Sequence, residues 1–386
     1  MAGKYYSRRQ LLAGGIGGAA ALLLINGQSA EAGTRRSMGS VHVVAHADDT
    51  ILFMNPDEQD DIARSVPVRA VFLTAGEGGS QGASYWESRE AGVLAAFAQM
   101  AGLANAWSGS TLSANGHGLD LQTLAANPKV SVVFMRLPDG GVDGSGFPAS
   151  NHESLQSLWT GTIPTIHAVD GSTSYAKEDL INTLVSVMTG FQPVTVRTQD
   201  FVNTFGGGDH SDHYAAALFT QAASNAYGSP QHTLLGYMGY PTYGLPANIS
   251  GERLKDKIDT FFTYAPHDFV VPQTLAAANN SVYGKWLTGQ YTVATMISGV
   301  TLSSLSPRSG ALAGGTVVTI DGSGFVPGST VAFGAVPAQG VTYVSSTQLT
   351  AVSPPATNSG LVNVTVTSAG STSTITRAAR FTYRKR

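Results

Sequence analysis

Residues 41–49 read VHVVAHADD, a short apolar run followed at once by an imidazole and two carboxylates. The run Val41–Ala45 has the length and composition of a buried strand. His46, Asp48 and Asp49 then fall where that strand ends. In an open α/β sheet, ligands bind at the carboxyl ends of the strands. The stretch therefore predicts the start of an α/β domain with a polar site at the edge of its sheet.

Short apolar runs and helical patterns continue to alternate up to about residue 292. Further strands are predicted at Val68–Thr74, Val130–Met135 and Val194–Val196, and helices at Tyr85–Met100, Leu180–Met188 and Asp212–Tyr227. Such alternation predicts an α/β fold: a Rossmann-like, mostly parallel sheet with flanking helices.

The composition is that of a folded protein, with 42% hydrophobic and 12% charged residues. The formal net charge is −3 and there is no long basic run, which argues against a nucleic-acid partner. The chain has no cysteine. Disulfides, thiolate zinc sites and cysteine nucleophiles are therefore excluded, and any metal must be held by His, Asp or Glu.

Residues 1–32 are predicted to be a signal peptide of the twin-arginine type. The pair Arg8-Arg9 is followed by the 15 apolar residues Leu11–Ile25, which are too few for a comfortable membrane span. Ala30–Ala32 offers a cleavage site. We expect a secreted or extracytoplasmic protein with no stable membrane span after cleavage. An ordinary secretory signal or an uncleaved anchor is the alternative.

The composition changes near residue 298, where Ser, Thr, Val and Gly come to dominate. Short alternating strands are predicted at Thr316–Ile320, Val341–Val344, Gln348–Val352 and Leu361–Val366. Turn residues such as 321–324 separate them, which indicates a small all-β sandwich. The runs GGT at 314–316, GSGF at 322–325 and FTY at 381–383 resemble the IPT/TIG domain family, whose fold is immunoglobulin-like.

This C-terminal region cannot assemble an acid–base pair or a metal triad. It has no histidine, and Asp321 is its one acidic side chain against six Arg and Lys. Its role is therefore binding or spacing. The basic excess would suit an anionic cell-wall polysaccharide, and a solvated surface without such a role is the alternative.

A second polar cluster, DHSDH at 209–213, opens the helix predicted at Asp212–Tyr227. His210 and His213 are three residues apart and so share one face of that helix. Two His and one Asp would form a three-ligand site with a position left for water, as in catalytic zinc sites. Each motif alone is weak, since the first can be a capped loop and the second can arise by chance. Their joint placement in one α/β domain is what indicates a site.

The runs AHADDT at 45–50 and HSDH at 210–213 resemble the A-H-P-D-D-E and H-P-D-H motifs of the LmbE/PIG-L-type deacetylases, zinc-dependent N-acetylglucosaminyl de-N-acetylases. The resemblance covers roughly residues 40–290. The predicted domains are therefore a deacetylase domain at 38–295 and an IPT/TIG domain at 298–384.

The resemblance implies that His46, Asp49 and His213 bind Zn²⁺. It also implies that Asp48 is the general base, and that a protonated His210 supports the oxyanion and protonates the leaving amine. The implied substrate is an N-acetylated sugar or glycoconjugate. The alternatives are a zinc amidase for another amide conjugate, or a non-catalytic carbohydrate-binding protein with a decayed site.

Three positions depart from the family pattern. Thr50 replaces the usual Glu and leaves the substrate in doubt, while Ala47 replaces Pro. Gly208 stands where some family members have a Tyr that helps the oxyanion.

Weaker candidates for substrate binding are Arg89, Trp86 and Asp139. Arg89 resembles a family Arg near the substrate, Trp86 would stack on a sugar ring, and Asp139 follows a predicted strand. A surface Arg, a core Trp and a turn Asp are the alternatives. Asp200 is a candidate outer-shell carboxylate for a metal-bound His, with a structural turn as the alternative. The His267-Asp268 pair is a candidate for the pocket rim.

Overall fold

The computed structural model describes residues 39–80, 82–227, 231–368, 371–373 and 375–385. The predicted signal peptide, residues 1–32, lies outside these residues. Within them, no helix combines the length and the apolar character that crossing a membrane requires.

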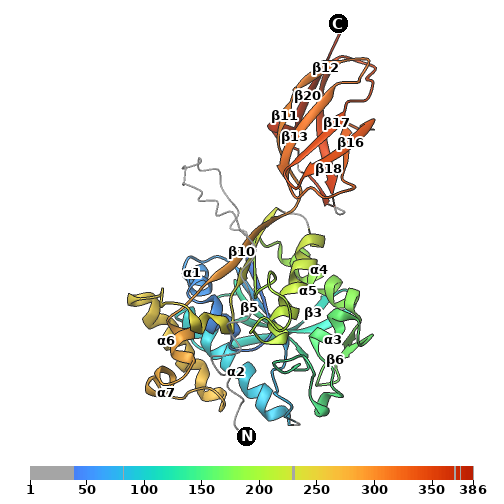
Figure 1. Cartoon of the computed structure of the whole chain (residues 1–386). Coiled ribbons are helices and arrows are strands. Elements are labelled where there is room, and N and C mark those ends of the chain that lie inside the picture. The colour runs from blue at the N-terminus through green and yellow to red at the C-terminus, as the bar shows by residue number, and fades with distance from the viewer. Residues whose placement is uncertain (1–38, 81, 228–230, 369–370, 374, 386) are drawn as a thin grey trace.

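An eight-stranded mixed sheet forms the centre of the first domain (Figure 1), in the order β10-β9-β8-β1-β2-β5-β4-β3. The five strands from β9 to β5 run parallel, whereas β10 and the β3–β4 hairpin are antiparallel to their neighbours. The strands are β1 (Ser40–Val44), β2 (Val68–Thr74), β3 (Trp107–Ala114), β4 (His117–Leu124), β5 (Val130–Leu137), β8 (Thr195–Thr198), β9 (His232–Tyr237) and β10 (Thr292–Ser298). The predicted α/β class with a mostly parallel sheet is confirmed.

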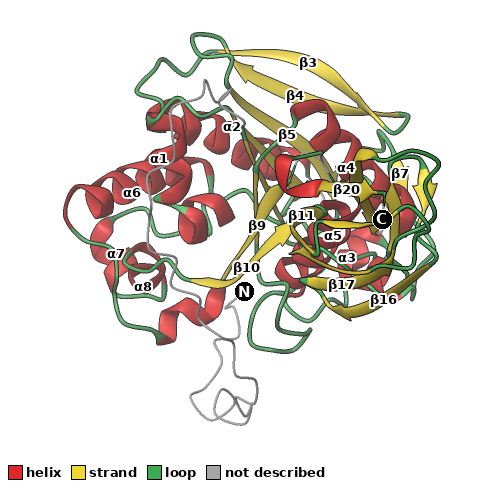
Figure 2. Cartoon of the chain, turned by 90° about the horizontal axis from the view of Figure 1, so that it is seen from above, coloured by secondary structure: helices red, strands yellow, loops and turns green. Residues whose placement is uncertain are grey.

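Helices cover both faces of this sheet, because successive strand residues point to opposite faces. Val43 belongs to one buried core with α3, α4 and α5, and Val44 to the other with α1, α2 and α6. Figure 2 shows these two groups of helices on either side of the sheet. The helices are α1 (Asp57–Ala63), α2 (Ala83–Met100), α3 (Leu155–Thr160), α4 (Lys177–Phe191), α5 (Ser211–Tyr227), α6 (Gly251–Tyr264), α7 (Leu275–Asn279) and α8 (Tyr283–Leu287).

The second domain is an all-β sandwich, as predicted. One sheet has the order β11-β13-β17-β16 and the other the order β12-β20-β18-β14-β15, with β19 on β18. Its strands are β11 (Thr301–Ser306), β12 (Ser309–Ala311), β13 (Val317–Ser323), β14 (Thr330–Phe333), β15 (Val336–Pro337), β16 (Gly340–Ser345), β17 (Gln348–Val352), β18 (Gly360–Ser368), β19 (Ser371–Thr372) and β20 (Arg380–Arg384). The turn predicted at 321–324 begins later, because pairing with β11 keeps Asp321 and Ser323 within β13.

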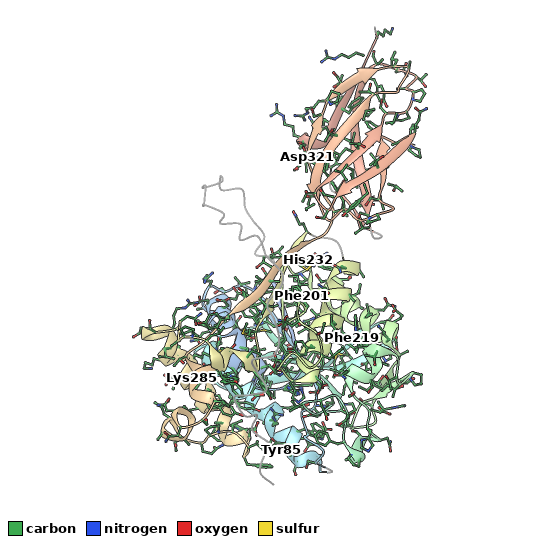
Figure 3. All side chains as sticks on the ribbon, viewed as in Figure 1. Tyr85, Phe201, Phe219, His232, Lys285 and Asp321 are labelled. Carbon is green, nitrogen blue, oxygen red and sulfur yellow. The ribbon has the colours of Figure 1, made fainter. Side chains whose placement is uncertain are left out.

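Strand β10 connects the two domains. It runs antiparallel to β9, with Thr292 opposite Tyr237 and Ser298 opposite His232. The chain therefore leaves the sheet at the edge where the parallel strands begin. Figure 3 shows His232 next to the second domain and Tyr85 at the far end of the first. The edge where the parallel strands end faces away from the second domain.

Candidate metal centre

The first motif forms a tight turn where β1 ends. The Asp49 N–H donates to the His46 carbonyl, and the His46 N–H donates to Asp49 Oδ2 at 2.6 Å. Thr50 then begins the short π-helix η1 (Thr50–Met54), which is buried along its whole length. The turn thus fixes the Asp49 carboxylate through one oxygen and leaves Oδ1 facing the interior.

Three donor atoms converge at this point. His213 Nε2 lies 3.0 Å from Asp49 Oδ1 and 3.2 Å from His46 Nδ1. His46 Nδ1 lies 3.5 Å from Asp49 Oδ2. Zn–N and Zn–O bonds of about 2.0–2.2 Å place tetrahedral ligand atoms roughly 3.3 Å apart. The structure therefore brings the three predicted metal ligands together at the spacing that one small cation requires.

Two further carboxylates fix the imidazoles. Asp209 Oδ1 lies 2.7 Å from His213 Nδ1, and Asp212 Oδ2 lies 3.4 Å from His46 Nε2. Each ring therefore has one nitrogen turned to a carboxylate and the other turned to the common point, as outer-shell partners arrange metal ligands. Gly239 allows this packing, because a Cβ there would lie 2.3 Å from Asp209 Oδ2 and 2.7 Å from His213 Nδ1.

The charges around the three donors fit a cation. Burial lowers the pKa of both ligand imidazoles, but Asp49 and the supporting carboxylates outweigh it. The pKa of His46 is raised well above its usual value, and that of His213 is raised to about 10. The buried carboxylates thus draw protons onto the rings, and a metal ion would displace those protons on binding.

His210 lies beside this centre in a second group of potential ligands with His46, Asp139 and Asp212. Its Nε2 is 3.7 Å from Asp139 and its Nδ1 is 3.7 Å from Asp212, so this group is looser. Burial and the nearby His46 lower the pKa of His210 to about 4, whereas Asp212 and Asp139 act in the opposite direction. These two carboxylates are the groups that would favour a proton on His210 during a reaction.

Asp48 lies next to the donors and forms an ion pair with Arg89, at 2.9 Å between carboxylate and guanidinium. Arg89 also contacts Asp268 at 2.9 Å and donates to the Tyr264 hydroxyl and the Gly76 carbonyl. Burial raises the pKa of Asp48, and the Arg89 charge opposes that rise. Arg89 is thus the buried partner of Asp48, and the surface alternative does not hold for this residue, which is 7% exposed.

An aromatic wall from the C-terminal part of the domain closes one side of the centre. The Tyr240 ring is 5.0 Å from the His213 ring and 6.1 Å from the His210 ring. Trp286 stacks on Tyr240 with ring centroids 4.8 Å apart. Tyr240 belongs to the 3₁₀ helix η3 (Tyr240–Gly244) and Trp286 to α8, so neither could be placed at the site from the sequence motifs.

One candidate from the sequence has a different role in the structure. Asp200 accepts hydrogen bonds from the N–H groups of Val202 and Asn203, so it shapes a turn. The carboxylate beside a ligand imidazole is Asp209, which is adjacent to the second motif and four residues before His213. Thr50 Oγ1, which stands in place of the family Glu, is buried without a hydrogen-bond partner among the described residues.

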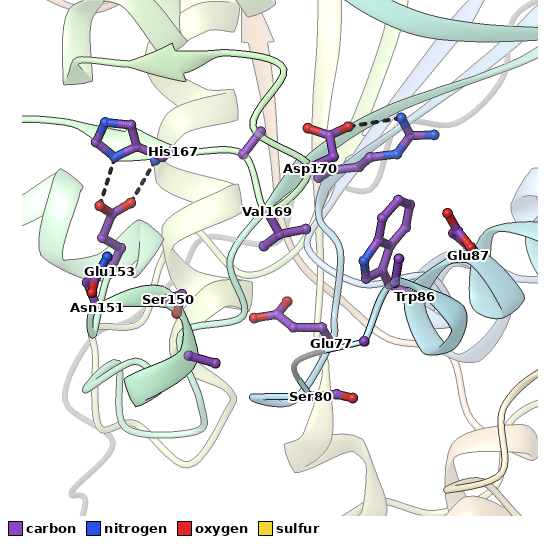
Figure 4. Close-up of a pocket in the computed structure, with 15 residues that line it drawn as sticks. Glu77, Ser80, Trp86, Glu87, Ser150, Asn151, Glu153, His167, Val169 and Asp170 are labelled. Atoms are coloured by element: carbon purple, nitrogen blue, oxygen red, sulfur yellow. Dashed lines mark hydrogen bonds and ion pairs between the residues drawn. The ribbon is translucent and has the colours of Figure 1, made fainter.

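Trp86 and Glu77 line a groove of about 1100 Å³ (Figure 4). Both Glu77 carboxylate oxygens accept from the Asp139 N–H, at 3.1 and 3.0 Å. Burial and the nearby Asp139 raise the pKa of Glu77 to about 7. Trp86 is mostly buried and lies under the Arg136 guanidinium, 5.0 Å from it. Asp139 therefore connects the groove to His210.

Residues 41–224 match the model of the GlcNAc-PI de-N-acetylase family, PIG-L, and residues 301–383 match the IPT/TIG domain model. The first domain belongs to the PIG-L-type deacetylase family, and the second is an IPT/TIG domain. The family supports hydrolytic N-deacetylation as the reaction. No curated protein matches the chain.

Solved structures show weaker likenesses. A conserved protein from Thermus thermophilus is 19% identical with a TM-score of 0.36, over 67% of this chain and 94% of that one. The A40926 pseudoaglycone deacetylase is 14% identical with a TM-score of 0.38, over 68% and 97%. The plexin A4 extracellular region is 22% identical with a TM-score of 0.21, over 25% of this chain and only 10% of that one. Likenesses of this size carry no information on what this chain acts on.

Proposed function

We propose that this chain is an exported metal-dependent hydrolase that removes the N-acetyl group from an N-acetylated amino sugar or glycoconjugate, with zinc as its metal. The convergence of His46, Asp49 and His213 in a PIG-L-type domain is the observation that carries the proposal.

These three residues would hold the ion. Bound zinc supplies Lewis-acid chemistry, because it polarises a carbonyl and lowers the pKa of a coordinated water to about 7. Histidine and aspartate also suit other divalent ions, so the donor set supports a metal more strongly than it supports zinc in particular.

The residues beside the donors carry the proton transfers. Asp48 accepts a proton from the attacking water, and the charge of Arg89 keeps this carboxylate ionised and oriented. Water adds to the acetyl carbon, the C–N bond breaks, and acetate and a free amine leave. The amine nitrogen must be protonated as it departs. The lowered pKa of His210 leaves its ring neutral before the reaction, so His210 would first take up a proton and then donate it to the amine, with Asp139 and Asp212 beside it.

Export and domain organisation are part of the proposal. Support for export is the Arg8-Arg9 pair followed by the apolar run Leu11–Ile25. The boundaries 38–295 and 298–384 stay predictions. For the IPT/TIG domain, the basic excess supports binding to cell-wall polysaccharide rather than a part in the chemistry.

The test is acetate release from N-acetylglucosamine oligomers by the zinc-loaded chain that follows residue 32. We expect Asp48→Asn to lower the rate by about 10²–10⁴-fold, the usual contribution of a general base, and to retain its metal. Glu252→Gln, an exposed carboxylate on α6, is the matched control and should leave the rate unchanged.

Three other outcomes separate the alternatives. Unchanged acetate release by Asp48→Asn would remove that residue from the mechanism. No acetate from the wild type with one metal bound per chain would contradict the sugar substrate and favour another amide. No acetate and no metal would favour the carbohydrate-binding protein.

A further inference from the structure

The groove beside the metal centre is large enough for more than the reacting group. Its volume is about 1100 Å³, slightly above the roughly 300–1,000 Å³ that pockets for drug-sized ligands occupy. Its walls come from the first turns of α2, the loop after β2, the helix η2 (Pro148–Ser150) with the residues that follow it, and residues 167–170. Several linked sugar rings would fit such a space.

The groove and the centre share one loop. Glu77 lines the groove, and a Cβ on the preceding Gly76 would lie 3.6 Å from the His46 ring. Glu77 also accepts from the Asp139 N–H, and Asp139 approaches His210. A chain whose acetyl group lies at the metal donors would therefore place its neighbouring units in the groove.

Acidic side chains outnumber basic ones in the groove lining. Four lining residues carry carboxylates, against one permanent cation, Arg136, and one histidine, His167. The four are Glu77, Glu87, Glu153 and Asp170. Figure 4 shows Glu153 with His167 on one side of the groove, Trp86 with Glu87 on the other, and Glu77 between them.

The two basic groups are already neutralised. Arg136 contacts the carboxylates of Glu90, Asp120 and Asp170 at 2.8, 2.5 and 3.1 Å. His167 Nδ1 lies 2.8 Å from Glu153. Glu87 is exposed and forms no ion pair within the part of the chain that the structure describes. Arg136 offsets only one of the three carboxylates that it contacts, and Glu87 adds an unpaired charge. The groove therefore keeps a net negative charge, although Glu77, with its pKa raised to about 7, is only partly ionised near neutral pH.

We propose that this groove selects amino-sugar oligomers that already carry free ammonium groups, that is, partly N-deacetylated chains, and disfavours chains that carry phosphate or carboxylate groups. The proposal rests on the proposed deacetylase function. A line of carboxylates attracts ammonium groups and repels anions, and such fields change association rates by about 10- to 1000-fold at low ionic strength. Each turnover creates one more ammonium group, so a chain binds better as it is processed.

The test uses three tetrasaccharides of equal length: fully N-acetylated chitotetraose, the same oligomer with one glucosamine unit, and a hyaluronan tetrasaccharide, which carries carboxylates. Acetate release should be fastest for the glucosamine-bearing oligomer and slowest for the anionic one. We expect about a tenfold difference in kcat/KM at 20 mM salt, falling to about twofold at 0.5 M, because salt screens exposed charges.

Variants of Glu87 test whether the preference arises from the charge of the groove or from the glycosidic linkages of the oligomers. Glu87→Gln should reduce the ratio of kcat/KM between the glucosamine-bearing and the anionic oligomer two- to threefold, and Glu87→Lys should reduce this ratio further. Glu252→Gln on α6, away from the groove lining, should leave the preference as in the wild type. Equal rates on the three oligomers, or the same preference in Glu87→Lys, would overturn the proposal while leaving the deacetylase function intact.

A binding measurement tests the proposed preference of the groove even if no acetate is released. Calorimetry with Asp48→Asn should show a tighter Kd for the glucosamine tetramer than for the hyaluronan tetrasaccharide, again lost at high salt. Weaker or equal binding of the glucosamine tetramer would reject the proposal. Failure of acetate release alone would reject the proposed function instead.

Discussion

The two domains differ most in the location of their charged side chains. In the first domain, five aspartates and three histidines lie close together where the parallel strands end, and most of them are buried. The second domain has one aspartate, Asp321, which accepts hydrogen bonds from exposed Ser304 and from Gln348. The core of this domain is apolar. Buried charges cost folding free energy unless they are paired, so natural domains keep them where chemistry needs them. The comparison assigns the chemistry to the first domain.

The connection between the domains supports the same division. Strand β10 carries the chain out beside His232, at the edge where the parallel strands begin. The three candidate metal ligands lie at the opposite end of the sheet, after β1 and at the start of α5. The IPT/TIG domain therefore lies away from the reacting group, which suits a role in attachment.

The largest expected effect is the loss of a metal donor. His213→Ala removes one of three converging ligands and exposes the negative charge of Asp49 and Asp209. We expect metal affinity to fall by far more than the roughly 10- to 100-fold that an outer-shell change costs, with acetate release lost. Metal content by mass spectrometry of the purified chain is the measurement. Asp321→Asn in the other domain is the control, and a full metal complement in His213→Ala would refute the assignment.

The second prediction concerns independence of the domains. Phe381 is fully buried between Phe333 and Tyr383, and truncation of such a residue costs about 3–5 kcal/mol. Phe381→Ala should lower the urea midpoint of the second domain and leave metal content and acetate release unchanged. The matched variant Phe219→Ala, in the core of the first domain, should lower both stability and activity. Loss of acetate release in Phe381→Ala would show that the domains depend on each other.

The third prediction compares a buried carboxylate with an exposed one. Burial raises the pKa of Glu77 from 4.5 to about 7, so its contribution to stability is fully present below pH 4.5 and is lost as the pH rises through 7. The free energy of unfolding of Glu77→Gln minus that of the wild type should therefore increase by up to about 3 kcal/mol between pH 4.5 and 7.5.

Asp321→Asn provides the opposite case. Hydrogen bonds from Gln348 and Ser304 lower the pKa of Asp321, so its stabilisation is present at neutral pH and is lost as the pH falls. The free energy of unfolding of Asp321→Asn minus that of the wild type should therefore decrease as the pH rises. The change should be small, because solvent screens this carboxylate. Urea titrations across pH measure both curves, and a flat Glu77→Gln difference would contradict the buried-carboxylate account.

The smallest effect is expected from an outer-shell change. Asp209→Asn keeps the shape beside His213 Nδ1 but removes the charge that orients the ring. Metal affinity should fall by about 10- to 100-fold. Competition with a chelator of known affinity measures it, and Asp200→Asn, whose carboxylate only shapes a turn, should match the wild type.

Much of the sheet was predictable because buried parallel strands are short apolar runs between polar residues. The prediction of Val68–Thr74 coincides with β2. Helix ends were less accurate, since α4 begins at Lys177 rather than Leu180. Its first turn carries Glu178 and Asp179, which are favourable near a helix N-terminus but lack the apolar period.

The β3–β4 hairpin was missed. Strand β3 is rich in Ser, and most of it is exposed at the edge of the sheet, so it lacks an apolar pattern. The turn itself carried a signal, because Asn115 and Gly116 both adopt positive φ, and Asn-Gly is a strong hairpin indicator.

The residues of the candidate site likewise include some that the sequence predicted and some that it did not. The metal donors belong to two local motifs, which a sequence displays directly. The partners of these motifs come from distant segments: Asp268 pairs with Arg89 across 179 positions, and Tyr240 packs on His213 from η3. Such contacts follow from tertiary packing: the sequence offered Asp268 only as a candidate for the pocket rim and gave no signal for its pairing with Arg89. Asp209, in contrast, was visible beside the second motif.

The most direct test of the account is an anomalous diffraction map of a zinc-loaded crystal of the chain that follows residue 32. The account predicts one peak bonded to His46 Nδ1, Asp49 and His213 Nε2, at about 2.0–2.2 Å. A peak held instead by Asp139, His210 and Asp212, or no peak at saturating zinc, would contradict it.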